Sequence, residues 1–363
     1  MTSDIILETQ ALQKRFIGRK PFFGDAKVVR AVDGINLKVR RGETLAIVGE
    51  SGCGKSTLAR LLVRLLPPTE GNVIYEGRNI ASVAAEEMRH LRRDLQFIFQ
   101  DPFSSLNPRM TVGALIEEPL LVHGIGDRPD RRAKVARMLA RVGLPASVID
   151  RYPHEFSGGQ RQRIGIARAL ITGPKVVIGD EPVSALDLSI QAQVINILQD
   201  LKADLGLTLV IIAHDLAVVR HMADRVAVMY LGEIVEQGPV DDLFAVPRHP
   251  YTAALIAAIP VAEMGARHAA PQLEGDPPNP IDLPTGCRFH PRCPHATEVC
   301  RTDRPRLLAT GPDRWAACHH AATLSLDGHM PSGHRRSPAV QARFDLYRAA
   351  QSARTHPAKT PTT

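Results

Sequence analysis

The sequence lacks any apolar run long enough to cross a membrane. A membrane helix needs roughly 18 or more consecutive apolar residues, whereas the run at 208–213 is short and the run at 253–262 is interrupted by Pro260. The first ten residues, MTSDIILETQ, also lack the basic start and apolar core of a secretory signal. We therefore expect a cytoplasmic chain without a spanning segment.

Cysteine is scarce, with five in 363 residues. Cytoplasmic thiols are kept reduced, so we do not expect structural disulfides. Zinc sites more often have closer cysteine pairs, and four thiolates also suit an iron–sulfur cluster. Three roles remain open for the four C-terminal cysteines: they bind a metal, they act as reactive thiols, or they are buried and inert. These cysteines are Cys287, Cys293, Cys300 and Cys318.

The excess of positive charge lies mainly at the C-terminal end. The formal net charge is +7, of which +4 falls in the Pro/Ser/Thr-rich residues 321–363. Such a basic tail is typical of solvated, disordered chain or of contact with anionic lipid. The remainder is nearly balanced, so nucleic acid is not an expected partner. The length of the whole chain allows about two domains.

The strongest local signal is GESGCGKST at 49–57, which fits the phosphate-binding pattern G-x-x-x-x-G-K-[ST]. An apolar strand at 44–48 precedes it and a helical pattern at 55–66 follows. Backbone N–H groups and a helix N-terminus then surround one point, where Lys55 can bind β- and γ-phosphates and Ser56 can ligate Mg²⁺. We expect nucleotide to be bound by Gly49, Glu50, Ser51, Gly52, Cys53, Gly54, Lys55, Ser56 and Thr57.

Three other predicted strands also end in polar residues. Open α/β sheets bind ligands at the carboxyl ends of their strands, so these ends should surround the phosphate loop. The residues are Gln100 as the last residue of the strand within 91–100, Asp180 and Glu181 at the end of 175–180, and His214 after 208–213.

The adjacent acids Asp180 and Glu181 would be costly at a buried strand end unless they act on a cation or a water. The assignment that fits nucleotide hydrolysis places Asp180 in the Mg²⁺ shell and lets Glu181 polarise the attacking water. Helix capping by Asp180 is the structural alternative.

A second anion-binding helix N-terminus is predicted at Ser157. Residues 111–155 are expected to form a helical insert, with helices at 112–122 and 131–142, and YPHEFSGGQRQR then opens a helix that continues to residue 171. A Ser-Gly-Gly helix start can bind phosphate as the first loop does. The two sites could share one ligand only by facing each other, within one chain or between two.

Taken together, these motifs resemble the nucleotide-binding subunits of ATP-binding cassette (ABC) transporters. The phosphate loop, Gln100, FSGGQ at 156–160, VVIGDE at 176–181, SALD at 184–187 and His214 occur in the family's order. FQDPFSSLNPRMTV at 99–112, the segment 152–170 and HPY at 249–251 resemble the oligopeptide/dipeptide permease ATPases, over about residues 5–320. Phe156 and Gly179 depart from the family pattern without removing a polar group.

The resemblance implies an α/β fold whose ABC-type P-loop ATPase core is a mixed β-sheet with flanking helices. This nucleotide-binding domain would occupy residues 5–240, with a helical subdomain at about 101–172. A small C-terminal extension of the oligopeptide-permease type, carrying the four cysteines, would occupy 241–320 and be followed by the basic tail at 321–363.

The resemblance also implies that two such subunits pack head to tail around two ATP molecules. His214 would contact the γ-phosphate, and His214 and Gln100 would assist Glu181 in catalysis. Gln100 would also ligate Mg²⁺ and sense the membrane subunits. Phe16 would stack on adenine, with Phe22 and Phe23 as rivals. The residues that act across the interface would be Ser157, Gly158, Gly159, Gln160 and Asp187.

By the same resemblance, the chain hydrolyses ATP to power import of di- or oligopeptides. Its partners would be a second ATPase subunit, two transmembrane permease subunits and an extracytoplasmic solute-binding protein, at the cytoplasmic face of the membrane. Nickel or glutathione remain alternative solutes. A soluble cassette ATPase acting on DNA or ribosomes is disfavoured, because such proteins usually carry two cassettes or a long coiled-coil insertion.

Similar peptide-permease ATPases have a C-terminal region that can hold a [4Fe-4S] cluster. The resemblance favours this cluster over Zn²⁺ at the four cysteines, with a structural role for the metal. Zinc could instead recruit histidine, and the alternates are His290, His295, His319 and His320.

Overall fold

The computed structural model describes residues 4–18, 26–101, 105–184, 186–259 and 278–326. Phe22 and Phe23, named as rivals of Phe16 for adenine, and the tail beyond residue 326 lie outside these ranges. None of the helices in the described ranges combines the length and apolarity needed to cross a bilayer.

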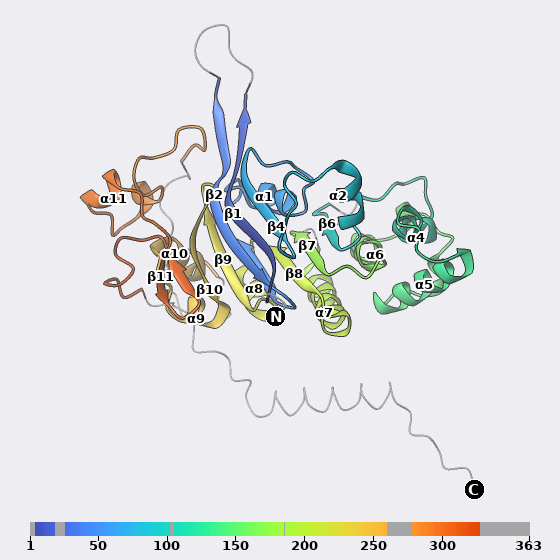
Figure 1. Cartoon of the computed structure of the whole chain (residues 1–363). Helices are drawn as coiled ribbons and strands as arrows, with labels where there is room; N and C mark the ends of the chain where they lie inside the picture. The colour runs from blue at the N-terminus through green and yellow to red at the C-terminus, as the bar shows by residue number, and fades with distance from the viewer. Residues whose placement is uncertain (1–3, 19–25, 102–104, 185, 260–277, 327–363) are drawn as a thin grey trace, which may run out of the picture.

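An eight-stranded mixed sheet forms the centre of the protein (Figure 1). Its strand order is β11-β12-β10-β9-β3-β8-β7-β6. The parallel part comprises β6 (Leu95–Ile98), β7 (Val176–Asp180), β8 (Thr208–Ile212), β3 (Thr44–Val48) and β9 (Arg225–Tyr230). The antiparallel part adds β10 (Glu233–Pro239), β12 (Arg314–Ala316) and β11 (Leu308–Gly311).

All five residues of strand β3 are buried. Because successive side chains of a strand point to opposite sides, both faces of β3 are covered. Leu45 and Ile47 belong to one apolar core, whereas Ala46 and Val48 belong to the other. The phosphate loop therefore begins at the end of a strand that is fixed from two sides.

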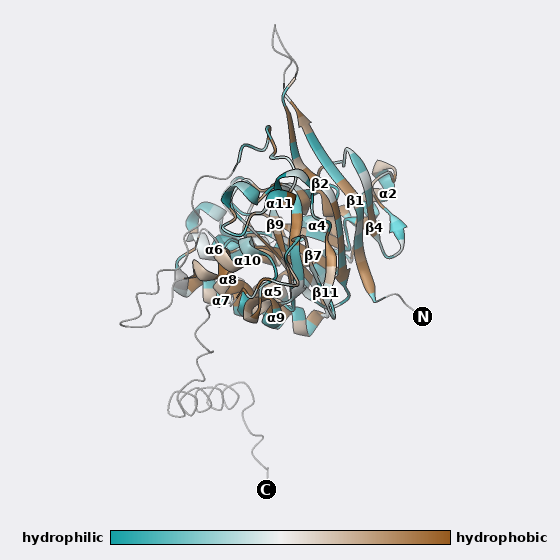
Figure 2. Cartoon of the chain, turned by 90° about the vertical axis from the view of Figure 1, so that its left-hand side faces the viewer, coloured by the Kyte–Doolittle hydropathy of each residue, from teal (hydrophilic) through white to brown (hydrophobic). Residues whose placement is uncertain are grey.

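A second sheet covers one face and is antiparallel, in the order β2-β1-β4-β5. It comprises β1 (Ile5–Ile17), β2 (Val28–Arg40), β4 (Glu70–Tyr75) and β5 (Arg78–Asn79). Hydrophobic and polar residues alternate along β2 (Figure 2), and its buried members share a core with Leu58 and Leu61 of α1 (Lys55–Leu62).

Helix α1 ends four residues before the predicted end at residue 66. Arg64 has a left-handed backbone with a φ of 51°, and Leu65 N bonds back to Arg60 O at 2.8 Å. Pro67 follows closely, and the residue before a proline is disfavoured in helical conformation. The spacing of apolar residues predicted which face of α1 is buried, but it did not predict that the helix ends at Leu62.

Helices cover the other face and the two ends of the sheet. The predicted helical insert is α4 (Val112–Val122), α5 (Arg128–Arg141) and the short turns η1 (Ala146–Val148) and η2 (Pro153–Glu155), packed on α6 (Gly158–Leu170). The remaining helices are α2 (Ala85–Leu91), α7 (Leu188–Leu205), α8 (Leu216–Met222), α9 (Val240–Ala245), α10 (Pro250–Ala257), η3 (His290–Arg292) and α11 (Glu298–Thr302).

The expectation of an α/β fold with a mixed sheet and flanking helices is confirmed. The insert lies at one end of the sheet beside β6, and the C-terminal strands extend the opposite end beside β10 (Figure 1). The phosphate loop lies between them, at the end of β3.

Candidate functional site

The phosphate loop runs so close to two strands that Gly49 and Gly54 leave no room for a side chain. Gly49 and Gly54 have φ values of 152° and 107°, in the region that favours glycine. A Cβ on Gly49 would lie 2.1 Å from Met229 O, and one on Gly54 would lie 2.0 Å from Ala31 O. The motif glycines thus let the loop fold against β9 and β2.

Lys55 is buried at the start of α1, and its ammonium is held by the loop itself. Its Nζ donates to Gly49 O at 2.7 Å and to Glu50 O at 2.8 Å. A compact positive charge is therefore fixed within the loop, beside a helix N-terminus. This arrangement suits the oxygens of a polyphosphate.

Ser56 and Asp180 join the loop to the end of β7. The Ser56 hydroxyl donates to Asp180 Oδ1 at 2.7 Å, and Arg60 Nη2 lies 4.0 Å from Asp180 Oδ2. Burial raises the pKa of Asp180, an effect that Ser56 and Arg60 partly offset. A hydroxyl and a carboxylate placed together are ligands that Mg²⁺ accepts. Two of the three residues expected to hold the metal, Ser56 and Asp180, are thus in contact.

The ends of three parallel strands meet at Glu181. Gln100, after β6, donates from Nε2 to Glu181 Oε2 at 2.9 Å, and His214 Nδ1, after β8, lies 3.6 Å from the same oxygen. The φ of Glu181 is 47°, which a non-glycine residue keeps only where its surroundings fix it. The structure therefore brings together the three residues expected to carry catalysis.

Ser157 begins α6 as a capping residue. Its hydroxyl accepts from Gln160 N at 3.4 Å, and Gln160 Oε1 accepts from Ser157 N at 3.1 Å. A Cβ on Gly159 would lie 2.4 Å from Ile190 Cγ2, so this glycine lets α6 pack closely on α7. Ser157 and Gln160 are exposed, as is Asp187 at the start of α7.

The helix start at Ser157 and the phosphate loop lie on different parts of the sheet. Helix α6 packs against β6 and the helices α4 and α5, whereas α1 packs against β7 and β8 (Figure 1). Each N-terminus thus offers backbone N–H groups from its own part of the molecule.

Phe16 is 42% exposed on β1, opposite Val29 of β2. Lys14 Nζ lies 5.4 Å from its ring centroid. Val29 is two residues from Ala31, whose carbonyl faces Gly54 of the phosphate loop. Phe16 is therefore a partly exposed aromatic residue on the strand paired with β2, which contacts the phosphate loop.

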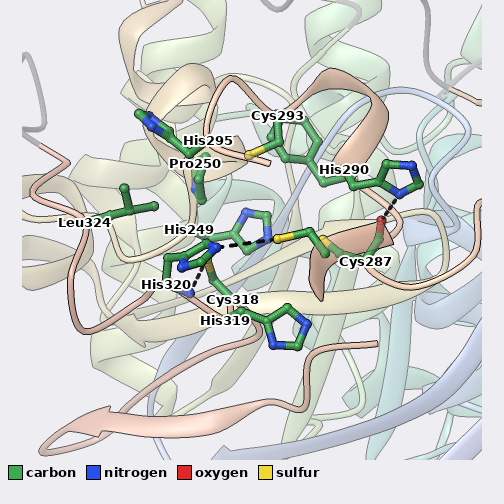
Figure 3. Close-up of a pocket in the computed structure, with 12 residues that line it drawn as sticks. His249, Pro250, Cys287, His290, Cys293, His295, Cys318, His319, His320 and Leu324 are labelled. Carbon is green, nitrogen blue, oxygen red and sulfur yellow. Dashed lines mark hydrogen bonds between the residues drawn. The ribbon is translucent and has the colours of Figure 1, made fainter. Parts of the chain in front are cut away.

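The four C-terminal cysteines line one cavity together with His249, His290, His295, His319 and His320 (Figure 3). Burial raises the pKa of Cys287 and of Cys318 to about 11 and also raises the pKa of Cys293. The Sγ of Cys300 lies 3.7 Å from His320 Nε2.

The shared cavity supplies the kinds of atom that iron or zinc would bind, but not a ready coordination shell. In the ranges that the structure describes, no group of three or more His, Cys, Asp or Glu side chains is arranged to hold a metal ion. The elevated thiol pKa values also mean that a metal would have to displace protons. Donor atoms for the predicted cluster thus line the cavity, but the described residues do not form a preassembled metal site.

Sequence reasoning missed one contact, between the phosphate loop and the cysteine-bearing region. Arg292 forms a two-pronged ion pair with Glu50, and Tyr251 Oη accepts from Glu50 N at 2.8 Å. The HPY segment at 249–251 was the available sequence signal for this contact. It draws attention to Tyr251 but does not reveal that Glu50 is its partner.

Two family models match the chain. Residues 32–184 match the one described as ABC transporter, and residues 235–300 match Oligopeptide/dipeptide transporter, C-terminal region.

Curated relatives match most of the chain. The probable peptide ABC transporter ATP-binding protein y4tS of Sinorhizobium fredii is 50% identical over 331 residues, covering 91% of this chain and 94% of that protein. The oligopeptide transport ATP-binding protein AppF of Bacillus subtilis is 48% identical over 87% of this chain and 97% of its own length. The dipeptide transport ATP-binding protein DppF of Haemophilus influenzae is 47% identical, with 87% and 96% covered.

Solved structures match the cassette part. The ATP-binding cassette MJ0796, in a dimeric post-hydrolysis state bound to ADP and Pi, has a TM-score of 0.58 and 29% identity, covering 65% of this chain and 99% of that one. CbiO1 of Clostridium perfringens, part of the ABC transporter complex cbiONQ, has a TM-score of 0.58 and 30% identity, with 67% and 91% covered.

Proposed function

This chain belongs to the oligopeptide/dipeptide family of ABC transporter ATP-binding subunits, and from that premise we propose that it hydrolyses ATP to power import of di- or oligopeptides. The peptide assignment is supported by relatives that are 47–50% identical to this chain and are named as peptide, oligopeptide or dipeptide transport ATP-binding proteins. The matched C-terminal region supports it as well. Nickel and glutathione remain the alternative solutes.

The observation that carries the ATPase proposal is the convergence on Glu181 of Gln100 and His214, beside the contact between Ser56 and Asp180. The loop N–H groups and Lys55 would hold the β- and γ-phosphates. Ser56, Asp180 and Gln100 would hold Mg²⁺, which supplies charge neutralisation at the phosphates when bound.

Glu181 would orient a water for attack on the γ-phosphorus. The new bond forms from the water oxygen, the bond to the ADP oxygen breaks, and a water proton passes toward the carboxylate. His214 would contact the transferred phosphate from the end of β8. The products are ADP and inorganic phosphate.

The exposed start of α6 is the basis for proposing a second ATPase subunit. Ser157, Gly158, Gly159, Gln160 and Asp187 would face the nucleotide bound by the partner, while Phe16 would stack on the adenine held by its own chain. The dimeric structure of the cassette MJ0796 supports this arrangement. Energy coupling then requires two permease subunits and a solute-binding protein, with this chain bound peripherally at the cytoplasmic face.

For the C-terminal region, we propose that Cys287, Cys293, Cys300 and Cys318 hold a [4Fe-4S] cluster, with Zn²⁺ and histidine ligands as the alternative. The support is that all four thiols line one cavity. We also propose the division into a nucleotide-binding domain at 5–240, including the helical subdomain at about 101–172, an extension at 241–320 and a tail at 321–363.

Purification of the tagged full chain from membranes tests this function. We expect permease subunits, a second ATPase and the solute-binding protein to be recovered, and uptake of labelled dipeptide to fail when Lys55→Ala replaces the native chain. Recovery with ribosomes or DNA, and unchanged uptake in the variant, would support the soluble cassette alternative. Labelled nickel and glutathione, tested alongside, decide the solute.

A further inference from the structure

Arg292 holds the phosphate loop from outside the cassette core. It lies in η3, between Cys287 and Cys293, and its side chain is only 5% exposed. Its Nη1 donates to Glu50 Oε2 at 2.8 Å and its Nη2 donates to Glu50 Oε1 at 3.0 Å. A two-pronged, charge-assisted pair fixes orientation as well as distance.

Glu50 is also held through its backbone. Its N–H donates to Tyr251 Oη at 2.8 Å. Tyr251 is fully buried, and its ring centroid lies 4.6 Å from that of Tyr230 and 5.4 Å from that of Phe289. An aromatic cluster made from β9, α10 and the cysteine-bearing segment therefore stands directly behind the loop.

The position of Glu50 bears on the phosphate-binding lysine. Glu50 O accepts from Lys55 Nζ at 2.8 Å and from Cys53 N at 3.3 Å. A change in the backbone at Glu50 would therefore move an anchor of Lys55. In a loop rich in glycine, which otherwise has many backbone states, such an anchor removes conformational freedom before ligand arrives.

A second arginine fixes the segment that presents Arg292. Arg288 is buried, and it pairs with Asp33 of β2 and, from Nε at 2.8 Å, with Glu233 of β10. Asp33 N donates to Gly232 O at 2.9 Å, and Gly232 N donates to Cys53 O at 2.9 Å. The cysteine-bearing segment is thus tied to the phosphate loop along two routes.

We propose that Arg292 is a positioning residue of the nucleotide site, which keeps the phosphate loop ready for ATP and makes nucleotide affinity depend on the cysteine-bearing region. This inference rests on the proposed ATPase function. Arg292 acts through Glu50, so its loss should weaken ATP binding and raise KM while leaving kcat at saturating ATP nearly unchanged. Loss of one charge-assisted pair corresponds to about a 10-fold weaker affinity.

The test is equilibrium binding of a fluorescent ATP analogue to the full chain, with Arg292→Gln, Arg292→Lys, Glu50→Gln and the double variant Arg292→Gln/Glu50→Gln. We expect Arg292→Gln to bind about 10-fold more weakly and Arg292→Lys to fall between, since lysine lacks the planar fork. The double variant should be no weaker than the weaker single one. Arg301→Gln, an exposed arginine of α11, is the matched control.

Four outcomes of this experiment bear on the inference. Wild-type affinity in folded Arg292→Gln, or fully additive losses in the double variant, would overturn the inference. If Arg292→Gln does not fold, Glu50→Gln and Arg292→Lys decide the same question. If the wild type binds the analogue no better than Lys55→Ala does, the proposed ATPase function fails before the role of Arg292 is addressed.

Discussion

Gln100 and Glu181, which follow neighbouring strands, are joined by a 2.9 Å hydrogen bond from the amide Nε2 to the carboxylate Oε2. His214 Nδ1 approaches the same oxygen at 3.6 Å. A carboxylate held by an amide and an imidazole has little freedom to rotate. Its orientation is therefore set before a water arrives, which is the condition for effective general-base catalysis.

Replacing Glu181 with glutamine keeps the size of the side chain and removes its charge. We expect ATP affinity to stay within about 2-fold, while turnover falls by about 10²-fold or more because the general base is lost. Phosphate release and binding of a fluorescent ATP analogue measure the two effects. Glu86→Gln on α2, where the carboxylate is exposed, should behave as wild type. Rapid multiple turnover by Glu181→Gln would remove its catalytic assignment.

Ser56→Ala should separate metal binding from nucleotide binding. The variant loses the hydroxyl that donates to Asp180 Oδ1 at 2.7 Å and that would ligate Mg²⁺. We expect nucleotide affinity to fall about 10-fold with Mg²⁺ present, as for loss of a charge-assisted contact, and to change little in excess chelator. Titration of Mg²⁺ at fixed nucleotide checks this. Equal losses with and without Mg²⁺ would mean that Ser56 serves the loop and not the metal.

Much of the candidate catalytic site could be predicted because its residues lie at positions that local sequence defines. Gly49 and Gly54 belong to a contiguous motif, and Asp180 and Glu181 end an apolar strand. Strands of one parallel sheet end at a common edge, so the approach of Gln100 and His214 to Glu181 follows from the fold class.

The contacts of the C-terminal region could not be predicted in this way. Arg292 and Glu50 are 242 residues apart in sequence, and neither belongs to a periodic pattern that would align them. The pairing of β12 with β10 likewise depends on a return of the chain that no local signal marks. Such long-range pairings are decided by tertiary packing.

Acid should destabilise the protein through His249. This residue is 1% exposed and caps α10, with its Nδ1 accepting from Tyr251 N at 3.1 Å. Burial lowers the pKa of His249 to about 3, whereas an unfolded histidine titrates near 6.5. The unfolded state therefore binds the proton first, so the contribution is fully present above about pH 6.5 and is lost as pH falls toward 3.

Between pH 7.5 and 5.5, the wild type should lose roughly 1 kcal/mol more unfolding free energy than His249→Asn, since asparagine retains a capping group without titrating. Urea denaturation at the two pH values measures the difference. His90→Asn, at an exposed position, should keep the wild-type pH dependence. If the unfolding free energies of the wild type and of His249→Asn fall equally between the two pH values, His249 is not the source of the acid sensitivity.

Metal content should distinguish the four cavity cysteines from Cys53, which lies in the phosphate loop. We expect anaerobically purified wild type to contain iron and acid-labile sulfide, and Cys318→Ser to lose them because one of four thiolate ligands is missing. Cys53→Ser, the matched control, should retain them. Zinc in place of iron would establish the alternative metal, and identical metal content in Cys318→Ser and wild type would contradict both.

Ser157 offers a test of the two-chain site that leaves the helix intact. The residue caps α6, so replacement by arginine would remove the cap as well as add charge. Asparagine and aspartate are both good N-caps and differ by one charge, which makes Ser157→Asn the control for Ser157→Asp. The aspartate would face the γ-phosphate held by the partner chain and repel it.

We therefore expect Ser157→Asp to bind ATP as an isolated chain with wild-type affinity, yet to lose ATP-dependent dimerisation and at least about 90% of hydrolysis at that pocket, because a repulsion of roughly 1–2 kcal/mol is enough for a tenfold effect. Ser157→Asn should retain most of both. Sedimentation and phosphate release on the same samples measure the two effects. If Ser157→Asp also loses nucleotide affinity as an isolated chain, Ser157 acts on its own phosphate loop and the two-chain site is wrong.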